Sequence, residues 1–282
     1  MATTLDEEAL GAPGRPPTEP IHPRPTRRAP WPVELYRSAV GKKWVMAITG
    51  LLLIGFVFVH ALGNLKVYFG AEAFNHYGEW LRTILVPFLP RTVFLWIMRL
   101  GLITAFVFHI HSAYSLTRMN QRARGGGYVQ DRDWQAADFA SRTMRWTGVI
   151  VGLFVVFHLA DLTWGMANPD FVRGDVYRNF VATFSRPAVA VIYIVANVAL
   201  GIHLFHGSWS MFQSMGVNNP RWNSWRRGFA VGLAALITAM NVMFPISVLT
   251  GIVDAEDNPD CTMRGDVIVS CTSYEADGEA AG

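Results

Sequence analysis

The sequence predicts an all-α membrane protein built as a bundle of five transmembrane helices. Of its 282 residues, 51% are hydrophobic and only 16% are charged, whereas soluble domains usually contain about 25% charged residues. The apolar residues gather in five uninterrupted runs, and a helix needs about 20 mainly apolar residues to cross the hydrocarbon core. The runs lack the alternation of barrel strands, so helices are expected.

The expected spans are residues 44–69, 93–116, 147–167, 188–211 and 229–253. Residues 1–32 are rich in Pro, Gly, Ala and charge, so we expect an N-terminal extension that is disordered at its start. The first span starts too late and is too long for a cleaved signal peptide, so the N-terminus should be retained. A five-helix anchor should occupy 33–253, followed by an acidic tail over 254–282.

Basic residues near the helix ends predict the orientation of the chain. They cluster before the first span, between the second and third, and between the fourth and fifth. By the positive-inside rule these regions and the N-terminus face the cytoplasm, while the acidic tail faces outward. The clusters are therefore topology signals rather than a nucleic-acid site. They comprise Arg27, Arg28, Arg37, Lys42 and Lys43; Arg118, Arg122, Arg124, Arg132, Arg142 and Arg145; and Arg221, Arg226 and Arg227.

Histidines lie deep inside four of the expected spans. An ionisable side chain in hydrocarbon is costly, which makes each a candidate functional residue. At about 1.5 Å per residue, two of them lie toward the outer half of the membrane and two toward the inner half. Facing imidazoles at paired depths favour haem ligation over interhelical hydrogen bonding alone. The outer residues are His60 and His158, the inner ones are His109 and His206, and His111 and His203 lie near the inner pair.

An ordered set of short motifs runs from about residue 41 to residue 219. Together they resemble the membrane cytochrome b subunit of succinate dehydrogenase and fumarate reductase, in its single-chain, five-helix form. The motifs are Gly41-Lys42-Lys43, His60-Ala-Leu-Gly-Asn64, Glu72-Ala-Phe-Asn75, Leu116-Thr117, Asn120-Gln-Arg-Ala-Arg124, Ala140-Ser-Arg-Thr-Met144, Phe157-His-Leu159 and Leu200-Gly-Ile-His-Leu-Phe-His-Gly-Ser-Trp-Ser-Met-Phe-Gln-Ser-Met-Gly216.

The resemblance implies a membrane anchor and electron-transfer subunit in the cytoplasmic membrane. A flavoprotein and an iron–sulfur subunit would dock on its cytoplasmic face, and electrons from succinate would reach menaquinone or ubiquinone. The chain itself shows no Gly-rich dinucleotide motif and no cluster-type cysteine run, so it would hold no dehydrogenase active site. Leu204 stands where some two-haem relatives carry a proton-conducting glutamate, which argues against a transmembrane proton route.

The resemblance also implies one or two haem b groups, with His60 and His158 as outer ligands and His109 and His206 as inner ligands. His203 matches a family position as well, which leaves it as an alternative inner ligand. His111 falls where relatives usually carry an apolar residue. Three roles remain for it: an interhelical hydrogen bond, which we favour, a quinone-site contact, or a displaced ligand.

The tail holds the only cysteines, Cys261 and Cys271, and they leave two interpretations open. Outside the cytoplasm the first is a disulfide. The second is a Rieske-type 2Fe-2S centre in place of haem, with His60 and His158 as the other ligands on the same side of the membrane. The same four ligands would suit zinc, which carries no electron.

Other polar residues have weaker assignments. Asp161 follows His158 by three residues and shares its helix face, so it is a candidate to orient that imidazole. Arg99 is a candidate partner for Asp161 or for a haem propionate. Two functional alternatives also stay open: a cytochrome b anchor of a hydrogenase or formate dehydrogenase, and a cofactor-free structural anchor. The candidate quinone contacts, among which the sequence does not choose, are Tyr36, Ser38, Arg91, Trp209 and Ser210.

Overall fold

The computed structural model describes residues 29–123, 136–216, 219–255, 261–264 and 267–271. Nearly all of the expected N-terminal extension and the end of the acidic tail lie outside the described residues. The helices are α1 (Trp31–Arg37), α2 (Ala39–Asn64), η2 (Leu65–Phe69), α3 (Ala71–Thr83), α4 (Val93–Ala123), α5 (Ala136–Leu162), α6 (Val176–Phe184), α7 (Pro187–Ser214), η3 (Pro220–Trp222) and α8 (Asn223–Leu249); the strands are β1 (Cys261–Arg264) and β2 (Val267–Cys271).

Five helices of the described chain, α2, α4, α5, α7 and α8, are long and apolar enough to cross a membrane. The predicted fold class is therefore confirmed. Several boundaries differ, because an apolar run marks the part of a helix inside hydrocarbon and not the whole helix. α4 continues to Ala123 through a polar, helix-forming stretch. α5 ends at Leu162, before the expected position, where the amides of Thr163 and Trp164 turn back onto the Leu159 carbonyl.

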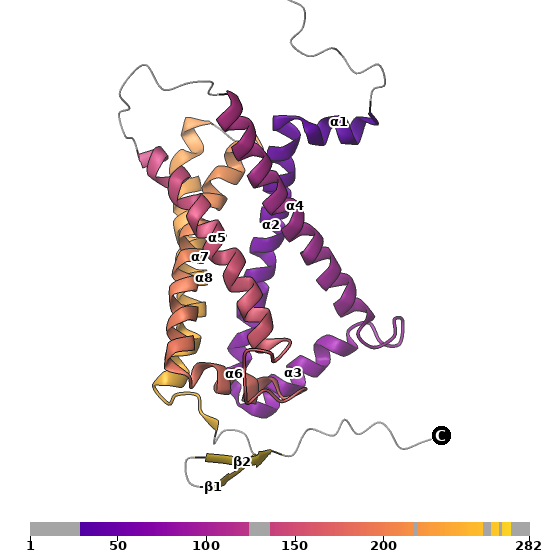
Figure 1. The fold of residues 1–282 in the computed structure, drawn as a ribbon, viewed down its shortest axis with the longest axis vertical. Helices are drawn as coiled ribbons and strands as arrows, with labels where there is room; N and C mark the ends of the chain where they lie inside the picture. Colours follow the sequence, from indigo (N-terminus) through magenta and orange to yellow (C-terminus); the bar gives the residue numbers. More distant parts are fainter. Residues whose placement is uncertain (1–28, 124–135, 217–218, 256–260, 265–266, 272–282) are drawn as a thin grey trace, which may run out of the picture.

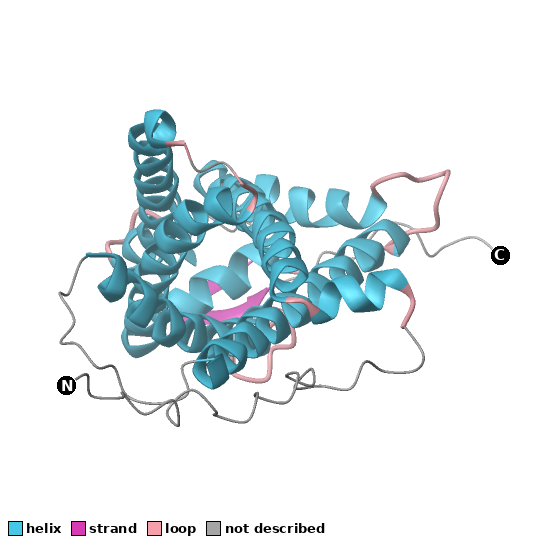
Figure 2. Ribbon diagram, turned by 90° about the horizontal axis from the view of Figure 1, so that it is seen from above, coloured by secondary structure: helices cyan, strands magenta, loops and turns pink. Residues whose placement is uncertain are grey.

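The five long helices alternate in direction (Figure 1). α1, the end of α4 and the link between α7 and α8 lie at one end, which we call the basic end because the basic clusters of the sequence fall there. α3, α6 and the two strands lie at the opposite, far end. In Figure 2, seen from above, the strands therefore appear behind the helices. This arrangement agrees with the alternation expected from the basic residues, whereas which end faces the cytoplasm stays a prediction.

A tight elbow joins α1 to α2 at the basic end. The Ser38 hydroxyl caps α2 by accepting a 2.9 Å hydrogen bond from the Gly41 amide. A side chain at Gly41 would clash with the Leu35 carbonyl, since an added Cβ would lie 1.9 Å from its oxygen. Lys42 is buried, and its ammonium donates to the Tyr36 and Arg37 carbonyls. The elbow is thus stabilised by hydrogen bonds between residues that are close in the sequence.

Packing differs along the bundle. α2 packs on α4, α5 on α7, and α7 on α8, and many apolar side chains of α2, α4 and α5 stay exposed, as expected for surfaces that face lipid. The best-packed core lies at the far end, where α3 and α6 meet α7 and α8. Its larger members are Phe74, Tyr177, Phe180, Phe184, Tyr193 and Phe244.

The tail contains a feature that the sequence analysis did not predict. β1 and β2 form an antiparallel hairpin at the far end. Its register places the Cα atoms of Cys261 and Cys271 directly opposite each other. The side chains of the hairpin lie outside the part of the chain that the structure describes.

Candidate functional site

The outer histidines face each other across the bundle. His60 lies on α2 and His158 on α5, with ring centroids 5.9 Å apart and ring planes at 88°. Aromatic rings surround the pair: Phe56 stacks on His60, and Tyr193 meets the edge of His158. The Nδ1 atom of His158 is buried without a hydrogen-bond partner among the described residues. The outer pair is therefore set in an apolar environment with an unsatisfied ring nitrogen.

The inner pair is formed by His109 on α4 and His203 on α7, with ring centroids 6.4 Å apart. Each ring is held by a buried threonine of the neighbouring helix. His109 Nδ1 lies 3.2 Å from Thr49 Oγ1 on α2, and His203 Nδ1 lies 3.3 Å from Thr147 Oγ1 on α5. The inner pair thus has polar contacts that the outer pair lacks.

A glycine follows each of these threonines and lets the histidine approach. A Cβ at Gly50 would lie 3.3 Å from Cε1 of His109, and one at Gly148 would lie 3.4 Å from Cε1 of His203. The first distance is tighter than an ordinary van der Waals contact and the second is at its lower limit, so each imidazole lies close against glycine backbone. The α2–α4 pair and the α5–α7 pair therefore share one arrangement, in which a Thr-Gly pair of one helix contacts a histidine of the other.

The two remaining candidate histidines have other partners. His206 Nε2 lies 3.3 Å from Thr143 Oγ1, one helical turn from the inner pair. His111 Nδ1 is hydrogen-bonded to the Tyr36 hydroxyl, and the two rings stack. His111 therefore links α4 to α1 at the basic end, and the geometry favours His203 over His206 as the residue that faces His109.

The spacing of both pairs suits two imidazoles on opposite sides of one metal. A metal-bound imidazole nitrogen lies about 2 Å from the metal, so opposed rings have centroids about 6 Å apart and two rings at the tetrahedral angle on one metal have centroids about 5 Å apart. The observed values of 5.9 and 6.4 Å match the opposed arrangement. No group of three His, Cys, Asp or Glu side chains converges within the described residues, but two axial imidazoles suffice for haem.

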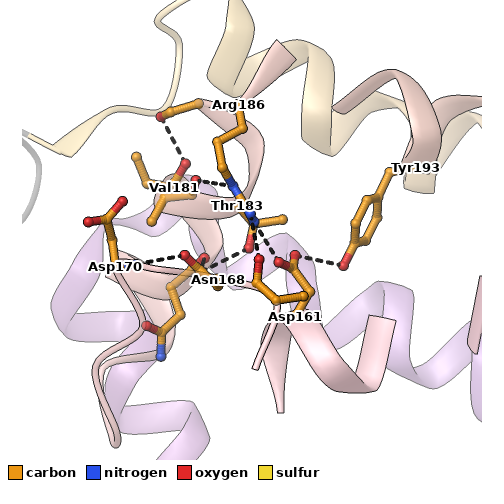
Figure 3. A network of polar contacts seen from close by, with 11 residues as sticks. Asp161, Asn168, Asp170, Val181, Thr183, Arg186 and Tyr193 are labelled. Atoms are coloured by element: carbon orange, nitrogen blue, oxygen red, sulfur yellow. Dashed lines mark hydrogen bonds and ion pairs between the residues drawn. The ribbon is translucent and has the colours of Figure 1, made fainter. Parts of the chain in front are cut away.

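A network of polar contacts lies at the far end, next to the outer histidine pair (Figure 3). The fully buried Asp161 accepts a 2.5 Å hydrogen bond from Arg186 Nη2 and a 3.2 Å hydrogen bond from the Tyr193 hydroxyl. Arg186 also donates to the Ala167 and Ala182 carbonyls. Since Asp161 lies one turn after His158 and Tyr193 touches the His158 ring, the network positions the outer histidine.

The candidate partner for Asp161 named from the sequence lies elsewhere. Arg99 sits over the ring of Trp96 on the same helix, 5.1 Å from its centroid. The partner that the structure shows, Arg186, precedes α7 and is far from Asp161 in the sequence. Helix packing brings the two together, and no local pattern predicts it.

The candidate quinone contacts are scattered. Ser38 caps α2, Tyr36 pairs with His111, and the Arg91 guanidinium donates to Glu79 at 2.5 Å. At the other side of the basic end, the Arg226 guanidinium lies 5.2 Å from the centre of the Trp209 ring. These residues do not come together as one site, so the quinone contacts stay unassigned.

Thr49 and Thr147 are site residues that the sequence analysis missed, although a signal for them is present. A Thr-Gly pair occurs at 49–50 and at 147–148, and in each case a histidine follows ten residues after the glycine, at His60 and His158. Ten residues correspond to about 15 Å along a helix, the separation between the inner and outer levels. The repeated Thr-Gly to His spacing thus marks both levels on α2 and α5.

Comparison with known proteins gives one finding. Residues 130–242, which include α5, α6, α7 and the first part of α8 with His158, His203 and His206, match the family model described as "Succinate dehydrogenase/Fumarate reductase transmembrane subunit". The comparison with curated proteins and the comparison with solved structures gave no significant match. With its five membrane-length helices the chain is a multi-pass membrane protein, and its residues 130–242 are similar to succinate dehydrogenase/fumarate reductase transmembrane subunits.

Proposed function

We propose that this chain is the membrane anchor and electron-transfer subunit of a succinate:quinone oxidoreductase in the cytoplasmic membrane. The observation that carries the proposal is the stacking of two facing histidine pairs at two levels of one helix bundle. The family match supports this complex over a hydrogenase or formate dehydrogenase. A flavoprotein and an iron–sulfur subunit are the partners it would require.

Two haem b groups fit the donor set best. His60 and His158 would hold the outer one, and His109 and His203 the inner one; the contact of His206 with Thr143 makes His206 the weaker candidate. Each haem would accept and release one electron. The ligand levels are about 15 Å apart along α2 and α5, so the pairs line up between the basic end and the far end.

The chain's own residues would bind, orient and shield these centres. The iron–sulfur subunit would dock at the basic end, which the positive-inside rule places in the cytoplasm. The Asp161–Arg186–Tyr193 network and the aromatic core of the far end would exclude water from the outer level. Leu204 is buried and offers no group for proton transfer, so electron transfer without a dedicated transmembrane proton route is expected.

The Rieske-type alternative requires both outer histidines on one iron, together with Cys261 and Cys271. The 5.9 Å separation of the imidazoles supports opposed ligation instead. The hairpin register supports a disulfide, because directly opposed residues of an antiparallel pair lie at a separation that a disulfide can bridge. The cysteines would then brace the outer hairpin and hold no metal.

The test is a dithionite-reduced minus oxidised spectrum of the purified complex, with haem, iron and acid-labile sulfide counted per chain. Two haems per chain would support the proposal. No haem, with two irons and two sulfides beyond those of the soluble subunits, would replace it with the histidine/cysteine cluster. No cofactor in this chain at all would leave it as a structural anchor.

A further inference from the structure

The two inner histidines share one arrangement, in which Nδ1 contacts the hydroxyl of a buried threonine. Thr49 and Thr147 are both buried, and each hydroxyl also lies within hydrogen-bond distance of a carbonyl of its own helix. Thr49 Oγ1 donates to the Val45 carbonyl at 2.7 Å, and Thr147 Oγ1 donates to the Thr143 carbonyl at 2.9 Å. A carbonyl oxygen can only accept, and when the hydroxyl proton is donated to it the threonine oxygen keeps its lone pairs for the histidine ring.

This donation sets the role of the histidine. A hydroxyl has one hydrogen and two lone pairs, so toward His109 and His203 the threonine oxygens can only accept. The ring atom at 3.2 or 3.3 Å is Nδ1 in both cases, and in this arrangement it is the donor. In a neutral imidazole with a proton on Nδ1, the other nitrogen, Nε2, carries a free lone pair.

Two such lone pairs on facing rings are suited to bind a metal ion. The hydrogen bonds of His109 and His203 with described residues involve Nδ1, and both rings are half-buried, so Nε2 of each ring remains available to a ligand. A metal ion between the rings would satisfy both at once. His206 lacks this arrangement, because a threonine contacts its Nε2 atom instead.

We propose that Thr49 and Thr147 are a matched pair of positioning residues that lock His109 and His203 in the Nδ1-protonated tautomer, presenting both Nε2 atoms to the inner metal centre. The proposal rests on the proposed function for the nature of that centre. It adds two residues, one per half of the repeated helix pair, and it selects His203 as the ligand opposite His109. An acceptor for the Nδ1 proton also raises the basicity of a ligand imidazole, which stabilises the oxidised metal.

The test replaces each hydroxyl by a methyl group in the full chain of the assembled complex. For Thr49→Val and Thr147→Val we expect the equilibrium constant for reduction of the inner haem to rise about tenfold. This corresponds to a midpoint potential higher by about 59 mV for a one-electron couple. The potential of the outer haem should not change. Thr49→Ser and Thr147→Ser keep the hydroxyl and should restore the potential. Thr104→Val is the matched control, because Thr104 donates to the Leu100 carbonyl in the same way but meets no histidine.

Unchanged inner potentials in both valine variants would overturn the inference while the haem proposal stood. A second measurement does not need the cofactor: ¹⁵N shifts of labelled histidines in the full chain report the tautomer directly. We expect the Nδ1–H tautomer for His109 and His203. Thr49→Val should allow the Nε2–H tautomer only in His109, and Thr147→Val only in His203. An Nε2–H tautomer in the unsubstituted chain would overturn the inference, whereas absence of haem would overturn only the proposed function.

Discussion

The inner and outer histidine pairs have similar spacing but opposite surroundings. The inner rings lie against glycine backbone, and their Nδ1 atoms are hydrogen-bonded to buried threonines. The outer rings are packed by aromatic side chains, and His158 Nδ1 has no partner among the described residues. The inner pair is thus oriented by hydrogen bonds and the outer pair by packing.

This difference separates two ways of tuning a metal ligand. A hydrogen bond to Nδ1 sets the tautomer and the basicity of the ring. Packing alone sets the orientation and excludes water, and the Asp161–Arg186 ion pair is linked to His158 through Tyr193. We therefore expect the two centres to have distinct potentials and to respond to different substitutions.

The largest expected effect comes from removing a ligand. His203→Ala should eliminate the inner haem and leave the outer one, because His203 faces His109. His206→Ala should retain both haems, since its Nε2 contacts Thr143. Haem per chain and the reduced-minus-oxidised spectrum measure both outcomes. Loss of the inner haem in His206→Ala, with retention in His203→Ala, would reverse the assignment.

Breaking the buried ion pair should come next in size. Arg186→Met leaves the fully buried Asp161 carboxylate without its cation, which typically costs about 3–5 kcal/mol of unfolding free energy. The loss of stability should be greatest around the outer histidines, and the thermal unfolding midpoint of the variant in detergent should be lower.

Arg91→Met is the matched control for this ion pair. It breaks the exposed pair with Glu79, which should cost about 1 kcal/mol or less. Equal losses in the two variants would show that the buried pair does not stabilise the far end.

A smaller and more local effect is expected from Tyr193→Phe. The variant loses the 3.2 Å hydrogen bond to Asp161 but keeps the ring that packs on His158. A hydrogen bond to a charged group is typically worth about 1.5–3 kcal/mol. We expect the outer haem to shift in potential and the inner haem to stay unchanged. Tyr114→Phe, at an exposed position of α4, is the control; a shift of both haems would contradict separate tuning.

The smallest effect is expected from the tail. Cys261→Ser, alone or with Cys271→Ser, should leave the visible spectrum and the iron count unchanged, because the hairpin register supports a disulfide. Thiol labelling of the unsubstituted protein should require prior reduction. Loss of two irons and two sulfides in the serine variants would instead make the cysteines ligands and join the tail to the outer centre.

The candidate site could be predicted in part from the sequence. The histidines stand out because an ionisable side chain within an apolar run is rare, and their distance along each span gives the level. The Thr-Gly pairs were less visible, since threonine and glycine are common in membrane helices and only their repeated spacing from His60 and His158 distinguishes them. The partner of Asp161 could not be predicted, because Arg186 lies just before α7 and only helix packing brings it to Asp161.

Composition and apolar run length alone determined that the chain crosses a membrane five times as helices, since backbone groups in hydrocarbon must be satisfied within each segment. Only the tertiary structure decided that His203 rather than His206 faces His109, and that Thr49 and Thr147 hold the inner rings. These choices depend on how each helix is rotated and where it crosses its neighbour. Interlocking side chains set that geometry, and spacing along one helix does not specify it.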